Sequence, residues 1–368
     1  MKNIKKAILI IALFFMAAAC FYVAALSGGE PVPVPAAVNS NEDIINDNNK
    51  NSPVLLNLAG DVLLASGVGR VMTMNGVDYP WEKVAGLLKE GDVTAANLEC
   101  CISARGRPEP DKQFTFRAVP GVLAGVQGAG IDVFTLANNH VLDFGPEAMK
   151  DTLVHLDNYG LAYTGAGMNV NCATMPVIVE KKGLKVGFLA FSRVLPRASW
   201  AAGPKRLGIA SGYDPGPVKD SVKSLAGRAD FVVVSLHWGK EMADYPRKED
   251  VGFGHMLVDA GADVVLGHHP HVIQGVEFYK NKMIAYSAGN FIFSPSSTRA
   301  REGMIIQVEA ENKKIGRARI IPTEIINAQT HILQGQQRER VLQRVRVLSG
   351  GMNSTVDPEG FVEPIKRV

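Results

Sequence analysis

The chain has 368 residues, of which 46% are hydrophobic, and its formal net charge is +3 at pH 7. This apolar content is enough for a substantial core, and the length fits either one large domain or two smaller ones. The net charge is small and the middle of the chain has no concentrated basic stripe. Both features argue against a nucleic-acid-binding protein, so we expect no nucleic-acid partner.

The N-terminus has the pattern of a membrane-targeting segment. Lys2, Lys5 and Lys6 precede residues 7–26, which are apolar and carry no charge. A helix of about 20 such residues crosses a bilayer, and preceding basic residues favour a cytoplasmic N-terminus. We therefore expect residues 1–26 to form a transmembrane signal-anchor of a single-pass cell-membrane protein with an extracytoplasmic main domain. The alternatives are a secreted protein cleaved after Ala19 and a lipoprotein modified at Cys20.

Three further segments follow the predicted anchor. Residues 27–52 are rich in Pro, Asn, Ser and Asp and favour a flexible linker. Residues 53–330 form the predicted main domain, and residues 331–368 a basic helix and tail that we expect to pack on it. In an oxidising compartment Cys172 could pair with Cys100 or Cys101, and the alternative is that the thiols stay free and buried.

Short apolar runs alternate with helical stretches through the main domain. The runs are rich in Val, Ile and Leu, and several are continuous, as is typical of strands buried on both faces. They are residues 54–60, 92–99, 132–138, 185–191, 230–238, 263–267, 282–289 and 303–311. Helices that end in glycine are predicted at 79–91, 119–130, 145–160 and 253–261. This alternation indicates an α/β domain.

Polar side chains with acid/base or metal-binding chemistry follow the ends of most predicted strands. They are Asp61, Asn97, Glu99, Asn138, Asn139, His140, Asp143, His237, Glu241, His268, His269, His271 and Asn290. In open α/β sheets, ligands bind beyond the carboxyl ends of the strands. We therefore expect these residues to converge on one site.

The spacing of the three clustered histidines separates their expected roles. In an extended chain, residues two apart point to the same side, and the residue before a proline is pushed toward extended geometry. His269 and His271, on either side of Pro270, should therefore point together as metal ligands. We expect His268 to face away and to support the site, since metal-bound imidazoles need hydrogen-bonded partners. By the same spacing Asn97 and Glu99 should point together.

Carboxylates, an asparagine amide and several imidazoles together are typical of Mn, Fe or Zn sites. The candidates outnumber the ligands of one tetrahedral ion, which favours two divalent ions. Paired ions about 4 Å apart stabilise the attacking and leaving oxygens of phosphoester hydrolysis. The residues thus predict a two-metal site.

Six short motifs occur in a characteristic order. They are GD (60–61), NLE (97–99), NNHVLDFG (138–145), HWGKE (237–241), GHHPHVIQGVE (267–277) and YSAGNFIF (286–293). The set resembles the CapA (PgsA) family of capsule and poly-γ-glutamate biosynthesis, which is similar to the calcineurin-like metallophosphoesterases. The resemblance implies a four-layer α-β-β-α sandwich with the site at the strand ends.

The resemblance also implies roles for individual residues. His140 matches the histidine that protonates the leaving oxygen, and Glu99 stands where a bridging aspartate is usual. The implied metal ligands are Asp61, Glu99, Asn139, His237, His269 and His271. Supporting or substrate-binding roles fall to Asn97, Asn138, Asp143, Glu241, His268 and Asn290. One departure is Leu63, which stands where a further histidine ligand is expected.

Two hypotheses about function follow. The first is a membrane-anchored, extracytoplasmic, metal-dependent hydrolase that acts on a phosphoester or an anionic polymer, with His140 as general acid. The second is a non-catalytic polymer-binding or export component of a membrane complex for poly-γ-glutamate synthesis. An ATP-dependent ligase is not supported, because the sequence lacks the G-x-x-x-x-G-K-[ST] loop.

Overall fold

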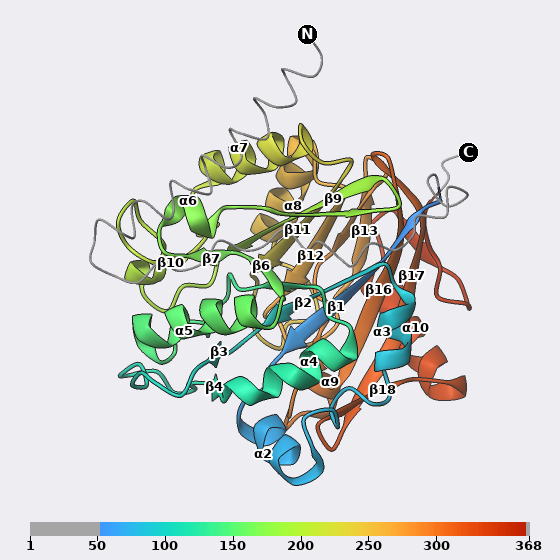
Figure 1. Ribbon diagram of the computed structural model, residues 1–368. Helices are drawn as coiled ribbons and strands as arrows, with labels where there is room; N and C mark the ends of the chain where they lie inside the picture. Colours follow the sequence, from blue (N-terminus) through green and yellow to red (C-terminus); the bar gives the residue numbers. More distant parts are fainter. Residues whose placement is uncertain (1–51, 366–368) are drawn as a thin grey trace.

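The computed structural model describes residues 52–365 (Figure 1). The predicted anchor at residues 1–26 and the predicted linker, except for its last residue, lie outside the described residues. Within residues 52–365, every helix falls short of the length and apolar character needed to span a bilayer.

The first of two large sheets has the strand order β18-β17-β16-β1-β2-β5-β6, and β15 pairs with β1 on one end of that strand. One half of this sheet is parallel and contains β15, β1, β2, β5 and β6. The other half is antiparallel and contains β16, β17 and β18. The bounds are β1 Val54–Val62, β2 Val93–Leu98, β5 Val133–Thr135, β6 Ala162–Thr164, β15 Asn290–Ile292, β16 Glu302–Glu311, β17 Lys314–Ile326 and β18 Gln329–Ile332.

The second sheet has the strand order β13-β14-β12-β11-β9-β8. Its four central strands are parallel, and one antiparallel strand flanks each side. The bounds are β8 Val177–Lys181, β9 Leu184–Ser192, β11 Phe231–His237, β12 Val264–His268, β13 Val276–Tyr279 and β14 Lys282–Ala285. Three small two-stranded sheets complete the described strands: β3 Cys101–Ile102 with β4 Arg117–Ala118, β7 Ala166–Gly167 with β10 Gly208–Ile209, and β19 Ser354–Val356 with β20 Val362–Pro364.

The two large sheets pack face to face because their central strands are apolar on both sides. Val93 of β2 and Val233 of β11 belong to one buried cluster between the sheets. Alternate side chains along each strand point to the opposite face, so Leu98 of β2 joins a cluster beneath one helical layer and Val234 of β11 joins a cluster beneath the other. The result is a mixed α/β sandwich with the layer order helices, sheet, sheet, helices (Figure 1).

The helices divide between the two outer faces. Over the first sheet lie α2 Ser66–Asn75, α3 Ala85–Glu90, α4 Leu123–Ala129 with the preceding turn η2 Pro120–Val122, and α5 Gly145–Asn158. Over the second sheet lie α7 Pro215–Ala226 and α8 Lys248–Ala260. The remaining described helices are α6 Val170–Ala173, η3 Ala198–Trp200, α9 Thr298–Arg301 and α10 Gly335–Leu348.

The C-terminal helix α10 is part of the domain core. Val341, Leu342, Val345 and Leu348 are buried in the cluster between the sheets. Its arginines lie on the other side, where Arg340 and Arg344 pair with Glu302. The helix therefore packs on the domain with its basic residues at the surface, as its amphipathic sequence predicts.

The α/β class and all eight predicted strands are present, with bounds that differ by a few residues. Helices α2 and α7 were not among the predicted elements. The thiols of Cys100 and Cys101 are free and buried, so the disulfide with Cys172 does not form in this structure.

Candidate metal centre

The candidate site lies where strand ends of the two large sheets meet. Asp61 on β1 is beside Asn97 of β2 and Asn290 of β15 in the first sheet. His237, the last residue of β11, is beside His268 of β12 in the second sheet. A hydrogen bond of 2.9 Å between His268 Nδ1 and Asp61 Oδ1 joins the two sheets here. The expected convergence of the strand-end residues is thus present in the structure.

Two glycines allow the strand ends to come this close. Gly60 precedes Asp61, and a Cβ atom built on Gly60 would lie 2.0 Å from the carbonyl oxygen of Gly289. Gly267 precedes His268, and its Cβ would lie 1.9 Å from the carbonyl oxygen of Tyr286. Any larger residue would push the backbone of residues 286–289 away from both strands, so glycine here is a requirement of packing.

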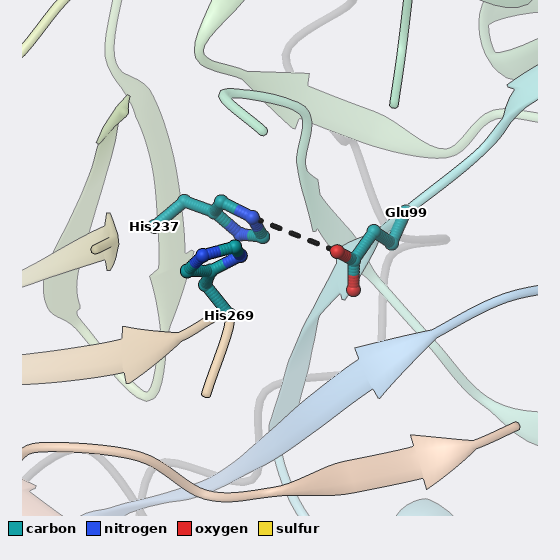
Figure 2. Close-up of side chains that lie close together, drawn as sticks. All are labelled: Glu99, His237 and His269. Atoms are coloured by element: carbon teal, nitrogen blue, oxygen red, sulfur yellow. Dashed lines mark ion pairs between the residues drawn. The ribbon is translucent and has the colours of Figure 1, made fainter. Parts of the chain in front are cut away.

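Glu99, His237 and His269 form the most buried group of potential metal ligands (Figure 2). One ligand atom from each lies within 4.8 Å of the others. His237 Nε2 is 3.5 Å from Glu99 Oε1, and the centres of the two imidazole rings are 4.8 Å apart. Asn139 adds a fourth donor, because its Oδ1 lies 2.8 Å from His237 Nε2.

Several atoms of this group are buried without a hydrogen-bond partner. They are both carboxylate oxygens of Glu99 and the Nδ1 atoms of His237 and His269. Each unpaired buried polar atom costs about 1–3 kcal/mol. His237 faces Glu99 with its Nε2 atom, so a cation at this place would satisfy the Glu99 oxygens and could bind His237 through Nε2. The donor set therefore fits a divalent metal ion.

Burial also sets the protonation of this group. It raises the pKa of Glu99 well above its usual range, and the nearby charge of Asp61 adds to the effect. It lowers the pKa of His237 well below its usual range and, with the charge of His271, lowers the pKa of His269 to about 3. Both imidazoles are therefore neutral near pH 7, which is the form that binds metals.

Asp61, Glu99 and His271 form a second group with ligand atoms within 4.8 Å of one another. His271 Nε2 is 3.8 Å from Glu99 Oε1, and His271 Nδ1 is 3.3 Å from Asp61 Oδ2. Burial would lower the pKa of His271, but the charges of Glu99 and Asp61 raise it to about 10. Burial would raise the pKa of Asp61, but hydrogen bonds with His268 and His271 hold it well below its usual range.

The backbone around Pro270 differs from the extended geometry that we predicted. His269 has φ +95° and His271 has φ +57°, so neither residue is extended. The two rings still approach the same site, with centres 6.0 Å apart. Residues other than glycine keep such φ values only where surrounding contacts hold them. Here the His271 Nδ1 atom lies 2.9 Å from Asn290 Oδ1, and the His269 amide donates to Asp61.

His140 lies in a separate polar group at the edge of the site. Its Nδ1 is 2.7 Å from Asp143 Oδ2 and 3.0 Å from Lys112 Nζ. Lys112 also donates to Asp143 and to the Asn139 carbonyl. The ring of Phe116 packs on the imidazole at 4.7 Å between centres. Burial lowers the pKa of His140 against the opposing effect of Asp143.

Three asparagines hold the segments that carry these ligands. Asn138 donates to Asn97 Oδ1 and the Leu98 carbonyl and accepts from the amides of His140 and Val141. Asn97 in turn donates to Asp61 Oδ1 at 2.9 Å. Asn290 also donates to the carbonyl oxygens of His271 and Ala300. Asn97, Asn138 and Asn290 therefore shape the site through hydrogen bonds.

The sequence did not single out Lys112 or Phe116 as part of the site. Both lie in the loop between β3 and β4, where no periodic pattern or metal-ligand spacing marks them. Arg117, which follows, does not face the cluster: its guanidinium donates to the carbonyls of Arg105 and Gly106 and lies over the ring of Phe144.

Comparisons with known proteins agree with the sequence motifs. The family profile "Bacterial capsule synthesis protein PGA_cap" matches residues 55–295. "Capsule biosynthesis protein CapA" of Bacillus anthracis is 30% identical over 284 residues, which cover 75% of this chain and 68% of that protein. "PGA biosynthesis protein CapA" of Bacillus subtilis (strain 168) is 29% identical over 271 residues, covering 73% and 71%. A hypothetical protein of known structure from Thermus thermophilus is similar with a TM-score of 0.45 and 17% identity, covering 74% of this chain and 99% of that one. The chain belongs to the PGA_cap family of bacterial capsule synthesis proteins, which confirms the resemblance of its motifs to CapA.

Proposed function

We propose that this protein acts outside the cytoplasm in capsule or poly-γ-glutamate biosynthesis, as a metal-dependent hydrolase of a phosphoester or of the anionic polymer. The observation that carries the proposal is the buried carboxylate of Glu99, which has no hydrogen-bond partner and lies beside the imidazoles of His237 and His269. The names of the Bacillus relatives support the biological role. The apolar run at residues 7–26 supports a single-pass membrane anchor and, with it, partners in a membrane synthesis or export complex.

The donors favour two divalent ions of Mn, Fe or Zn. Glu99, Asn139 and His237 would hold one ion and Asp61, Glu99 and His271 the other, and His269 lies close to both groups. Such ions polarise a phosphoryl or carbonyl oxygen and supply a nucleophile at neutral pH.

His140 is placed to handle the proton of the leaving group. Asp143 accepts from its Nδ1, which leaves Nε2 as the nitrogen that can donate. Asp143 stabilises the imidazolium, and its Oδ2 also accepts from the Phe116 amide at 2.7 Å. The Lys112 ammonium, which donates to Asp143 and lies 3.0 Å from Nδ1, holds that carboxylate in place and adds positive charge where an anionic substrate would bind.

One observation favours the second hypothesis, a non-catalytic polymer-binding component. Leu63, in place of the expected histidine, is buried in the cluster beneath the helices over the first sheet. Asp61 Oδ1 is already shared by Asn97 and His268. A second ion that is held weakly would suit the binding of polymer carboxylates better than the cleavage of the polymer.

The test uses the full-length protein purified in mild detergent. Bound metal is measured by mass spectrometry, and cleavage of a chromogenic phosphodiester and of poly-γ-glutamate is assayed for wild type, Glu99→Gln and His140→Ala. Lys205→Ala, a change at an exposed lysine, is the control.

We expect the wild-type protein to contain metal and to cleave one of the two substrates. Glu99→Gln should lose metal and activity, whereas His140→Ala should keep the metal and lose at least about 100-fold in kcat, the usual contribution of a general acid. A metal-loaded wild type that binds poly-γ-glutamate but cleaves neither substrate would favour the non-catalytic role. A wild type without metal would refute the metal-dependent function.

A further inference from the structure

We propose that Glu241 is a metal ligand that acts together with His269 and His271 and takes the place of the histidine absent at position 63. This inference rests on the proposed metal centre and adds a third protein segment to it. Glu241 follows β11 in the HWGKE motif and is exposed.

The distances fit coordination of one ion. A carboxylate oxygen of Glu241 and one imidazole nitrogen each of His269 and His271 lie within 4.8 Å of one another. Ligands about 2.1 Å from a tetrahedral ion lie about 3.4 Å apart. Small side-chain rotations therefore bring all three donors onto one ion, and an exposed side chain makes such a rotation without repacking the core.

The loop that carries Glu241 is attached to the histidine segment. The Met242 amide donates to the carbonyl of Pro270 at 2.9 Å, between the two histidines. Gln274 donates from its side chain to the Ala243 carbonyl, also at 2.9 Å. Met242 has φ +60°, and the Ala243 amide bonds back to Lys240, so the loop turns sharply at Glu241. The carboxylate is thus held beside the imidazoles by the backbone of its own loop.

An independent observation points to a ligand at this place. His269 is 6% exposed, and its Nδ1 has no hydrogen-bond partner. The second ion also lacks a donor, since Leu63 is buried in the core and Asp61 shares its oxygens with Asn97 and three histidines. Glu241 is an exposed carboxylate whose oxygen lies within 4.8 Å of a ring nitrogen of each of His269 and His271.

The experiment measures Mn²⁺ binding to the full-length protein. Metal is first removed with a chelator, and Mn²⁺ stoichiometry and dissociation constants are then measured by equilibrium dialysis. The variants are Glu241→Gln, which removes the charge, and Glu241→Asp, which keeps a carboxylate. Glu249→Gln is the matched control, because Glu249 is an exposed glutamate that pairs with Arg247 at the surface. Circular dichroism verifies that each variant is folded.

We expect wild type and Glu249→Gln to bind two Mn²⁺ ions. Glu241→Gln should retain the tighter ion and bind the weaker one at least about 10-fold less tightly, since even partners outside the coordination shell are worth that much. Glu241→Asp should recover part of the loss. Binding by Glu241→Gln within twofold of wild type at both positions would overturn the inference.

The same measurements separate this inference from the proposed hydrolase. If Glu241→Gln loses one ion and the wild-type protein cleaves no substrate, the ligand role is supported and hydrolysis is refuted. If Glu241→Gln binds Mn²⁺ as the wild type does and the wild-type protein cleaves substrate, only the ligand role is refuted. A wild type that binds no Mn²⁺ would overturn both.

Discussion

Asn138 and Asn139 are neighbours in sequence, and the structure predicts opposite consequences for their replacement. Asn138 makes four buried hydrogen bonds, at 3.0 and 2.7 Å as donor and at 3.0 and 3.1 Å as acceptor. Asn139 has one side-chain bond, the 2.8 Å contact with His237. The first residue holds the loop, and the second faces the candidate metal position.

The expected magnitudes follow from these bonds. A buried hydrogen bond contributes about 1 kcal/mol net, and its loss leaves partners unsatisfied. Asn138→Ala should therefore lower the free energy of unfolding by about 4 kcal/mol, and Asn139→Ala by about 1 kcal/mol. Conversely, Asn139→Ala should weaken Mn²⁺ binding at least about 10-fold, because it removes a proposed ligand.

Urea unfolding of the metal-free full-length proteins measures the first effect, and equilibrium dialysis measures the second. Metal-free conditions keep ligand binding from adding to the measured stability. If Asn138→Ala cost less than Asn139→Ala in unfolding free energy, the role assigned to Asn138 in holding the loop would be wrong. Unchanged Mn²⁺ affinity in Asn139→Ala would remove Asn139 from the metal centre.

Two further predictions concern titration and thiol reactivity. The pKa of His271 is about 10 in the folded protein, above its ordinary value of about 6.5. In chelator, its contribution to stability should be complete below about pH 6.5 and disappear as the pH rises toward 10. Urea midpoints between pH 6 and 10 should fall in wild type more than in His271→Gln, and equal slopes would contradict the assignment. Burial raises the pKa of both the Cys100 and Cys101 thiols, that of Cys101 to about 12. Because the thiolate is the reactive form, both should resist iodoacetamide at pH 8 until urea unfolds the chain, as mass spectrometry of digested samples would reveal. Rapid alkylation in the native protein would contradict this burial.

The sequence predicted eight strands of the two large sheets because the signal of a buried strand is local, whereas others, such as β17, were not predicted. A run such as that of β11, whose side chains are all buried, is apolar in itself, and the polar residues that follow it mark the strand end. Helices α2 and α7 were not predicted. Both are amphipathic, with Val68 and Met72 of α2 and Val218, Val222 and Leu225 of α7 buried beneath the two helical layers, so their apolar spacing was itself a signal for a helix.

The geometry around Pro270 could not be predicted from local rules. The preference of a residue before proline for extended backbone amounts to a small energy difference. In this fold, contacts of the segment with Asp61 and Asn290 outweigh it. Lys112 is a similar case, since its reach to Asp143 depends on how the loop between β3 and β4 folds back over the site.

The sequence by itself determined the α/β class, the family and the set of residues available for a metal centre, because these depend on residue types and on their order. Only the tertiary structure decided which atoms meet. The bond between His268 and Asp61 joins residues 207 positions apart, and the partnerless atoms of Glu99, His237 and His269 appear only when the two sheets close around them. Long-range packing sets the burial, and burial sets both the protonation of these side chains and the cost of leaving them without a partner.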